Sequence, residues 1–320
     1  MAETGLCIEA KSSGAGKLAY ETLLEIFVHL DAAALLACTR VCSKWRIIAA
    51  DSRIWRSLDL SHAASSHLNS PTLQDHVKRD ATSLHVRNPS RLTEADLALL
   101  VKLLNDSSSL ETLSLEYCVF EEPFTLALTS LHSLSLSGST VVVDCNLYCP
   151  QLSVLDLSHC AQIDRTVALI PLHFPNLEKL SLAGCYSLSS SAIRGLLTQL
   201  PRLTSLDLRY ISGIESRTVK PWISKTSQPV TLDIRHCEVF TVRDIKSLRK
   251  LAFEGSEIIH SAILCDHTED SYRAYIDLVI GATVFAPDRH DEFYCSSLSA
   301  SSATSSASSS PESCAVEWTL

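Results

Sequence analysis

The residues most able to do chemistry are the 12 cysteines and the histidines beside some of them. The closely spaced pairs are Cys38/Cys42, Cys145/Cys149, His159-Cys160 and His236-Cys237. Thiolates and imidazoles are common zinc ligands, but a structural zinc site needs four of them to converge at a recognisable spacing. Cys160, Cys185 and Cys237 instead recur at one position of a repeated pattern, where a small thiol packs beneath the end of a strand. We therefore expect no metal and no other cofactor.

A second candidate for chemistry is the run Gly14-Ala15-Gly16-Lys17, which has the composition of a phosphate-binding loop. It lacks the upstream glycine at the right distance, and Leu18 stands where Ser or Thr would bind magnesium. No Ser-His-Asp or Cys-His set is recognisable elsewhere. The sequence therefore predicts a non-catalytic protein, and an enzyme with its site in residues 256–320 is the alternative.

Composition narrows the class of protein. Of 320 residues, 46% are hydrophobic and 20% charged, and 27 basic against 36 acidic side chains give a net charge of −9, which argues against nucleic acid as the main partner. The first residues lack the apolar core of a signal peptide, and residues 274–286 are too few to span a membrane. Many cysteines without an export signal indicate reduced thiols. We expect a cytoplasmic and/or nuclear protein that binds neither nucleic acid nor membrane.

Large apolar residues are concentrated between Leu18 and Trp55 at the spacing of short helices. Fewer than about forty residues cannot bury so much apolar surface by themselves. This stretch therefore needs a neighbour, which is the rest of the chain, another protein, or both.

The same stretch resembles an F-box in sequence and spacing. The apolar residues that carry the resemblance are Leu18, Leu24, Ile26, Phe27, Leu30, Leu35, Val41, Cys42, Trp45 and Trp55. Ala19, Asp31 and Ala34 depart from the family pattern, which often has proline at the first two positions and an acidic residue at the third. Because such prolines preset the start of a helix, their loss leaves the start of the first helix open. An ordinary helical hairpin within a larger core is the alternative interpretation.

A second pattern, Leu-x-x-Leu-x-Leu, repeats from Trp55 onward. Its second leucine position falls at 58, 84, 113, 134, 155, 180, 206, 232 and 251, a period of 19–29 residues. The pattern, and the cysteine that ends several units, resemble leucine-rich repeats of the cysteine-containing subtype. The leucines of Leu-x-Leu point inward from a short strand, and the residue between them points outward. Neighbouring units must stack to bury their leucines, which predicts a parallel sheet with a continuous core.

The segments between the strands should be helical in the longer repeats. Residues 92–104 and 189–200 carry apolar residues at helical spacing, and Thr93 with Asp96 is a suitable cap. The 21-residue units around positions 134 and 155 are too short for a full helix and should return through loops or a single turn. The predicted fold class is α/β: an N-terminal helical F-box followed by a curved leucine-rich-repeat solenoid, with parallel strands inside and helices or loops outside.

The ends of the chain have a different composition from the repeats. The repeat pattern fades after residue 256, and a terminal segment must cover the open end of the core. Residues 296–313 are almost entirely serine and other small residues. We therefore expect a disordered N-terminus (1–17), an F-box (18–56), leucine-rich repeats (57–256), a C-terminal capping segment (257–294) and a disordered Ser-rich tail (295–320).

Charged residues are predicted on the inner, concave face of the solenoid, which faces solvent. Asp207 and Arg209 flank one residue that points into the core, and Asp233 and Arg235 flank the equivalent residue of the next repeat. One interpretation is a platform for a partner peptide, with the two arginines binding a carboxylate or phosphate. The other is an Asp/Arg ladder that neutralises itself and keeps the surface solvated. The candidate substrate-binding residues are His85, Arg87, Glu116, Asp156, Lys179, Asp207, Arg209, Asp233 and Arg235.

The resemblance implies a function. In F-box/leucine-rich-repeat proteins the F-box docks on the Skp adaptor, and through it on the cullin and RING subunits of a ubiquitin ligase, while the repeats hold the substrate. It implies that the ten apolar residues carrying the F-box resemblance form the adaptor-docking module, and that this chain is a substrate receptor without chemistry of its own. The alternative is a leucine-rich-repeat interaction scaffold that is not coupled to a cullin ligase. The substrate, any need for its phosphorylation and the role of the Ser-rich tail cannot be read from the sequence.

Overall fold

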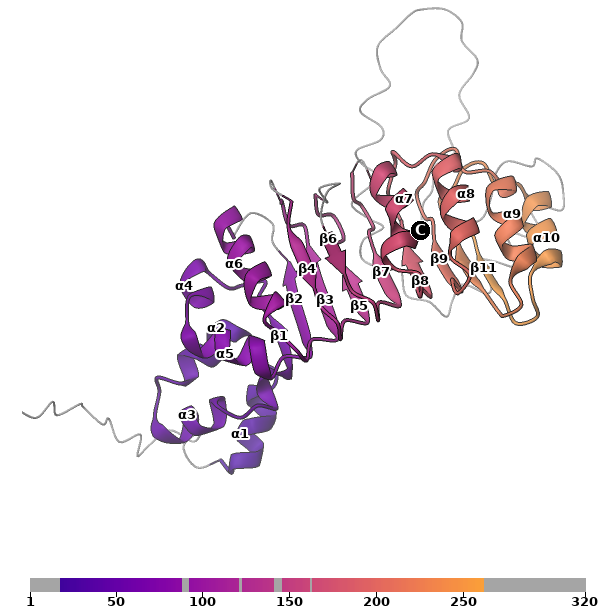
Figure 1. Cartoon of the computed structure of the whole chain (residues 1–320). Helices are drawn as coiled ribbons and strands as arrows, with labels where there is room; N and C mark the ends of the chain where they lie inside the picture. The colour runs from indigo at the N-terminus through magenta and orange to yellow at the C-terminus, as the bar shows by residue number, and fades with distance from the viewer. Residues whose placement is uncertain (1–17, 88–91, 121–122, 141–145, 162, 262–320) are drawn as a thin grey trace, which may run out of the picture. The chain divides into compact units, whose positions relative to one another are not determined.

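The computed structural model describes residues 18–87, 92–120, 123–140, 146–161 and 163–261, all of which lie in one compact unit (Figure 1). The predicted N-terminal segment, the Ser-rich tail and all but the first residues of the predicted capping segment lie outside the described residues. No helix of the described part is long and apolar enough to cross a bilayer.

Three short helices open the described chain, as predicted. They are α1 (Tyr20–Phe27), α2 (Ala32–Cys38) and α3 (Ser43–Ala49). Ala19 stands at the N-cap of α1 and gives it no side-chain cap, whereas Asp31 caps α2 by accepting a hydrogen bond from the Ala34 amide at 2.7 Å. An aspartate side chain thus starts the second helix at the position where the F-box family often has proline.

Trp55 joins the helices to the sheet. It lies in the 3-10 turn η2 (Ile54–Arg56), which runs directly into the first strand, and it is 0% exposed. Its indole Nε1 donates to the Ala49 carbonyl at 2.7 Å, and its ring stacks on His76 with centroids 4.3 Å apart. His76 lies on α5 (Pro71–Arg79), and α2 contacts both α5 and α4 (Ser65–Leu68). The helices and the repeats therefore share one hydrophobic core.

The described part contains a sheet of nine strands, all parallel to their neighbours. In spatial order they are β1 (Ser57–Asp59), β2 (Ser83–Arg87), β3 (Thr112–Glu116), β5 (Ser133–Ser135), β7 (Val154–Asp156), β8 (Lys179–Ser181), β9 (Ser205–Asp207), β10 (Thr231–Asp233) and β11 (Glu257–Ile259). The second leucines stand in register from Leu58 to Leu232, and each is buried. The predicted inward leucines and parallel sheet are confirmed.

The prediction of the ninth repeat unit, around position 251, was wrong. Residues 248–256 do not form a strand, because Leu248 and Leu251 belong to α10 (Val242–Leu251). That helix begins at a capping box in which Thr241 and Asp244 exchange hydrogen bonds. The ninth strand is β11, where Ile258 stands opposite Leu232, so the sheet continues past the predicted end of the repeats.

The connecting segments cover the other side of the sheet (Figure 1). Helices return the longer repeats, and the predicted cap of Thr93 with Asp96 is present. The two 21-residue units, predicted as loops or a turn, instead carry a second, two-stranded parallel sheet of β4 (Thr125–Ala127) and β6 (Asn146–Tyr148). The helices on this side include α6 (Glu94–Asn105), α7 (Asp164–His173), α8 (Ser190–Gln199), α9 (Ser216–Lys225) and α10, and α4 and α5 contact α6.

Candidate binding surfaces

Burial divides the ten apolar residues predicted to dock a partner. Four of them lie in the core, namely Leu24, Phe27, Leu35 and Trp55. Four more are partly buried, namely Leu18, Leu30, Cys42 and Trp45. Only Ile26 and Val41 are largely exposed, at 45% and 58%. The core residues shape the module, whereas a partner can reach the exposed ones.

Two further exposed apolar residues lie in the same N-terminal helical module, and the sequence did not predict them as docking residues. Val28 follows α1 and is 48% exposed, and Ile47 on α3 is 65% exposed. The adjacent Ile48 is 0% exposed, so one isoleucine of the pair faces the core and the other faces solvent. Four large apolar side chains exposed on so short a module are candidate contacts for a protein partner. We call Ile26, Val28, Val41 and Ile47 the exposed apolar set.

Polar contacts hold this module in one arrangement. Tyr20 on α1 donates its hydroxyl to Asp51 at 2.8 Å, and Arg53 binds the same carboxylate through two nitrogens at 3.0 and 2.7 Å. These hydrogen bonds, chiefly that from Arg53, hold the pKa of Asp51 well below its usual range. The rings of Phe27 and Trp45 meet edge to face with centroids 5.2 Å apart. The exposed apolar set therefore stands on a preformed scaffold.

The nine predicted substrate-binding residues all lie in the strands or in the two residues after them, and their register is now defined. The residues between the paired leucines form one row across the sheet: Asp59, His85, Ser114, Ser135, Asp156, Ser181, Asp207, Asp233 and Ile259. Arg87 stands opposite Glu116, two residues further along their strands. Lys179 stands opposite Val154 and Ser205, two residues before the row, and is exposed. We call this surface the strand face.

Hydrogen bonds connect the side chains of the strand face across neighbouring strands. Ser135 donates to Asp156 at 3.3 Å, and Asp156 also accepts from the amide and hydroxyl of Ser158. The hydroxyls of Ser158 and Ser181 lie 2.7 Å apart, and Ser181 donates to Asp207 at 3.2 Å. The middle of the strand face is thus a polar network rather than a set of separate side chains.

Ion pairs continue this network at its C-terminal end. Arg209 binds Asp207 with its Nη2 at 3.0 Å and lies 3.7 Å from Asp233. Arg235 binds Asp233 through Nε at 3.1 Å and Nη2 at 2.9 Å. Asp207 and Asp233 stand directly opposite each other, so each needs a cation beside it. These contacts favour the interpretation of a self-neutralised Asp/Arg ladder over that of an anion-binding platform.

A row of turn residues follows the strands and was not predicted. Tyr117, His159, Tyr210 and His236 all adopt left-handed backbone, with φ of 54–61°, at equivalent positions. In this conformation the amides of Tyr117, His159 and Tyr210 continue the ladder; for example, the Tyr210 amide donates to the Arg235 carbonyl at 3.1 Å. The His236 amide donates to the Ser261 hydroxyl instead. The rings of Tyr210 and His236 stack 4.4 Å apart, and Arg87 lies 5.1 Å from the centroid of Tyr117. Positive φ at such bulky residues is unusual, and sequence spacing gives no signal for it.

The cysteines after the strands are buried hydrogen-bond donors. The thiols of Cys160, Cys185 and Cys237 donate to carbonyls of the preceding repeat at 3.0–3.1 Å, and the hydroxyl of Ser139 makes the same contact at 2.7 Å. Burial raises the pKa of Cys160 and Cys185 to about 12 and that of Cys237 to about 11. Within the described residues, no cluster of His, Cys, Asp and Glu could hold a metal ion. These thiols are structural and unreactive.

The N-terminal module also matches a known family. A family model described as F-box-like matches residues 20–61. The chain joins an F-box-like domain to leucine-rich repeats. It is 26% identical to human F-box/LRR-repeat protein 12 over 207 residues, which are 58% of this chain and 61% of that protein. The chain thus spans about three fifths of the length of that relative.

A solved structure of internalin C2 from Listeria monocytogenes is also similar, with 15% identity, a TM-score of 0.40, and coverage of 72% of this chain and 92% of that one.

Proteins that combine an F-box with leucine-rich repeats are typically non-catalytic receptors, and the F-box generally binds the Skp adaptor. Residues 20–61 run from α1 through Trp55 into the first repeat, so the F-box ends inside the shared core.

Proposed function

We propose that this chain is a substrate-recognition subunit of a Skp–cullin–F-box ubiquitin ligase. The F-box binds the adaptor, and the repeats bind the protein that is to be ubiquitinated. The observation that carries the proposal is the F-box-like domain with its exposed apolar set, built on a preformed scaffold at one end of a repeat sheet. The chain does no chemistry itself, and it works in the cytoplasm or nucleus, where its cysteines stay reduced.

The rigid connection between F-box and repeats supports this mechanism. Trp55 belongs to the F-box, yet it stacks on His76 of the repeat region and is fully buried. A substrate held by the repeats is then kept at a defined position relative to the adaptor. Such tethering replaces a rare bimolecular encounter of a substrate lysine with the ubiquitin-carrying enzyme by an effectively intramolecular one.

Co-expression with the Skp adaptor, followed by size-exclusion chromatography, tests the proposal. The wild-type chain should elute as a one-to-one complex. Ile47→Asp should weaken binding by at least about tenfold, because burying an isoleucine contributes about 1.5–3 kcal/mol. Leu172→Asp is the matched control, since Leu172 on α7 is also apolar and 73% exposed but lies far along the sequence from the F-box.

Leu24→Asp is a poor test, although Leu24 belongs to the predicted docking set. Its side chain is only 8% exposed, so a charge there would destabilise the module itself. A wild-type chain that elutes apart from the adaptor would refute the adaptor assignment. Equal binding by wild type and Ile47→Asp would show that the exposed apolar set is not the docking surface.

The second candidate is a scaffold that is not coupled to a ligase. It is favoured by the strand face, where Arg209 and Arg235 are already neutralised by aspartates and therefore do not form an anion-binding site. The two functions differ in their assemblies. A ligase receptor should co-purify with cullin and RING subunit, whereas a scaffold should carry the adaptor alone or neither.

A further inference from the structure

The C-terminal repeats carry a charge opposite to that of the whole chain. Residues 190–251 contain eleven basic and five acidic side chains, a net charge of +6, in a chain whose net charge is −9. Arg209 and Arg235 are neutralised on the strand face by Asp207 and Asp233. The remaining nine basic and three acidic side chains therefore belong to α8, α9, α10 and the loops beside them. This asymmetry indicates an anionic partner for the helical side of these repeats.

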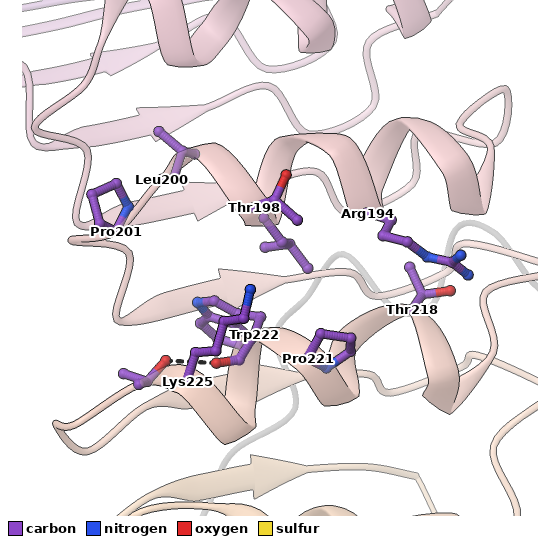
Figure 2. A pocket seen from close by; sticks show the side chains of 10 residues that line it. Arg194, Thr198, Leu200, Pro201, Thr218, Pro221, Trp222 and Lys225 are labelled. Atoms are coloured by element: carbon purple, nitrogen blue, oxygen red, sulfur yellow. Dashed lines mark hydrogen bonds between the residues drawn. The ribbon is translucent and has the colours of Figure 1, made fainter.

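A groove between α8 and α9 lies within this basic region (Figure 2). Its volume is about 180 Å³. The buried side chains of Leu197, Leu200 and Trp222 form its apolar part, and Arg194 and Lys225 are exposed at its margin. The Trp222 indole is fixed because Nε1 donates to the Leu203 carbonyl at 3.3 Å. The groove thus combines a rigid apolar surface with two cations.

A second hollow of about 460 Å³ continues this groove toward the loops that precede the strands. It shares Pro201, Lys225 and Thr226 with the first and adds Arg202 and a single carboxylate, that of Glu178. Together the two hollows place three cations, Arg194, Arg202 and Lys225, along one continuous depression. An extended peptide could contact all three.

The three cations are available to a ligand. Among the described residues, none of them forms an ion pair, whereas the nearby Arg217 and Lys220 bind Glu215 and Asp244. An anionic ligand can therefore pair with these three exposed cations without breaking an ion pair of the described structure.

We propose that this groove binds an acidic, extended protein segment that carries an apolar side chain. Its carboxylates pair with Arg194, Lys225 and Arg202, and its apolar side chain packs on Trp222 and Pro221. A protein segment fits better than a membrane, because none of the exposed large apolar side chains of the described part lies on α8 or α9. It fits better than nucleic acid, because the net charge of the chain is −9 and the groove has an apolar floor.

Fluorescence anisotropy with a labelled peptide of repeating Glu-Glu-Leu tests the proposal on the full chain. The matching Gln-Gln-Leu peptide measures the contribution of charge. The wild-type chain should bind the acidic peptide at least about tenfold more tightly than the neutral one, and the difference should shrink as salt is added. The double variant Arg194→Glu/Lys225→Glu should lose at least about tenfold in affinity, since two ion pairs are lost and each reversed charge repels the peptide.

Two controls separate the groove from a diffuse basic surface. Lys102→Glu/Arg165→Glu makes the same charge change at exposed positions on α6 and α7 and should change affinity less than about twofold. Thr198→Phe fills the groove from an exposed position on α8 without changing charge, and it should weaken binding at least as much as the double charge reversal. Circular dichroism shows whether each variant remains folded.

Three results would overturn the proposal. The first is equal affinity for the acidic and neutral peptides. The second is binding that survives Thr198→Phe, because a diffuse basic surface would then suffice. The third is a preference for single-stranded DNA or anionic vesicles over the acidic peptide. The readout does not involve the adaptor, so it stands or falls independently of the proposed ligase function.

Discussion

Three glycines make a quantitative prediction of stability possible. They differ in whether their backbone is left-handed and in whether an added Cβ would overlap a neighbouring side chain. Gly184 has φ +68°, and a Cβ there would lie 2.7 Å from Cε1 of the His159 ring. Gly213 has φ +79°, but a Cβ there would meet nothing within 4 Å. Gly195 lies inside α8, where a Cβ would also meet nothing within 4 Å. Alanine at the three positions therefore separates backbone strain from steric overlap.

The expected free energies of unfolding follow from these differences. Gly195→Ala should stabilise the fold by about 0.5–1 kcal/mol, because alanine is the better helix former. Gly213→Ala should destabilise it by about 1–2 kcal/mol, which is the cost of left-handed backbone for an L-residue. Gly184→Ala carries the same cost and adds about 1–3 kcal/mol for overpacking against His159. The total for Gly184→Ala is about 2–5 kcal/mol.

Urea denaturation followed by circular dichroism measures all three values, and a fourth variant tests the cause. His159→Gly in the Gly184→Ala background removes the ring and should recover the overpacking part, a coupling of about 1–3 kcal/mol. Glycine suits position 159, whose φ is 59°. Equal losses for Gly184→Ala and Gly213→Ala, or no coupling with His159→Gly, would refute the close packing of the His159 ring against position 184.

Three further predictions concern stability. The four thiols of Cys118, Cys160, Cys185 and Cys237 have raised pKa values of about 11–12 against an ordinary value of 9.0, so their contribution to stability is complete below pH 9 and is lost as the pH rises toward 11–12. At pH 10 each thiol should cost about 1.4 kcal/mol, and Cys160→Ser should lessen the loss in urea denaturation by that amount, since Ser139 already makes the equivalent contact. Trp55→Ala should destabilise the chain by about 3–5 kcal/mol in the same assay, whereas a loss below about 1 kcal/mol would contradict its role as the junction of F-box and repeats. Hydrogen bonds from Ser65 and Ser216 help to lower the pKa values of Asp96 and Asp244, so the stability that these carboxylates confer should be present above about pH 4 and lost at lower pH. Asp96→Asn should flatten this acid dependence of the free energy of unfolding. An unchanged pH profile in that variant would refute the prediction.

Most of the architecture could be predicted because it depends on local patterns. The Leu-x-Leu alternation specifies which face of a strand is buried, and a sheet of such strands requires neighbours in register. The capping pair Thr93 and Asp96 marks a helix start by its spacing alone. The error at residues 248–256 has the same origin, because leucines three residues apart also suit a helix, and the capping pair of Thr241 and Asp244 decides between the two.

The binding surfaces were less predictable because they depend on three-dimensional neighbours. Ile47 and Ile48 are identical in type and adjacent in sequence, yet their exposures are 65% and 0%. The acidic partners of Arg209 and Arg235 could be guessed from spacing, but whether they neutralise the arginines depends on rotamers. The groove beside Trp222 joins residues of two repeats, and no single repeat contains its pattern.

The neutralised arginines change what the strand face can recognise. A guanidinium that already holds a carboxylate must lose that contact to bind a second anion, and the aspartate left behind would keep its negative charge without the cation that neutralises it. A phosphate or carboxylate on a substrate is therefore a poor ligand for Arg209 or Arg235. The exposed Lys179 forms no ion pair among the described residues, and the serine hydroxyls of the central strands can still accept hydrogen bonds beside those that they already make. Recognition on this face should therefore rely on hydrogen bonding and shape, and the excess positive charge of the C-terminal repeats remains on their helical side.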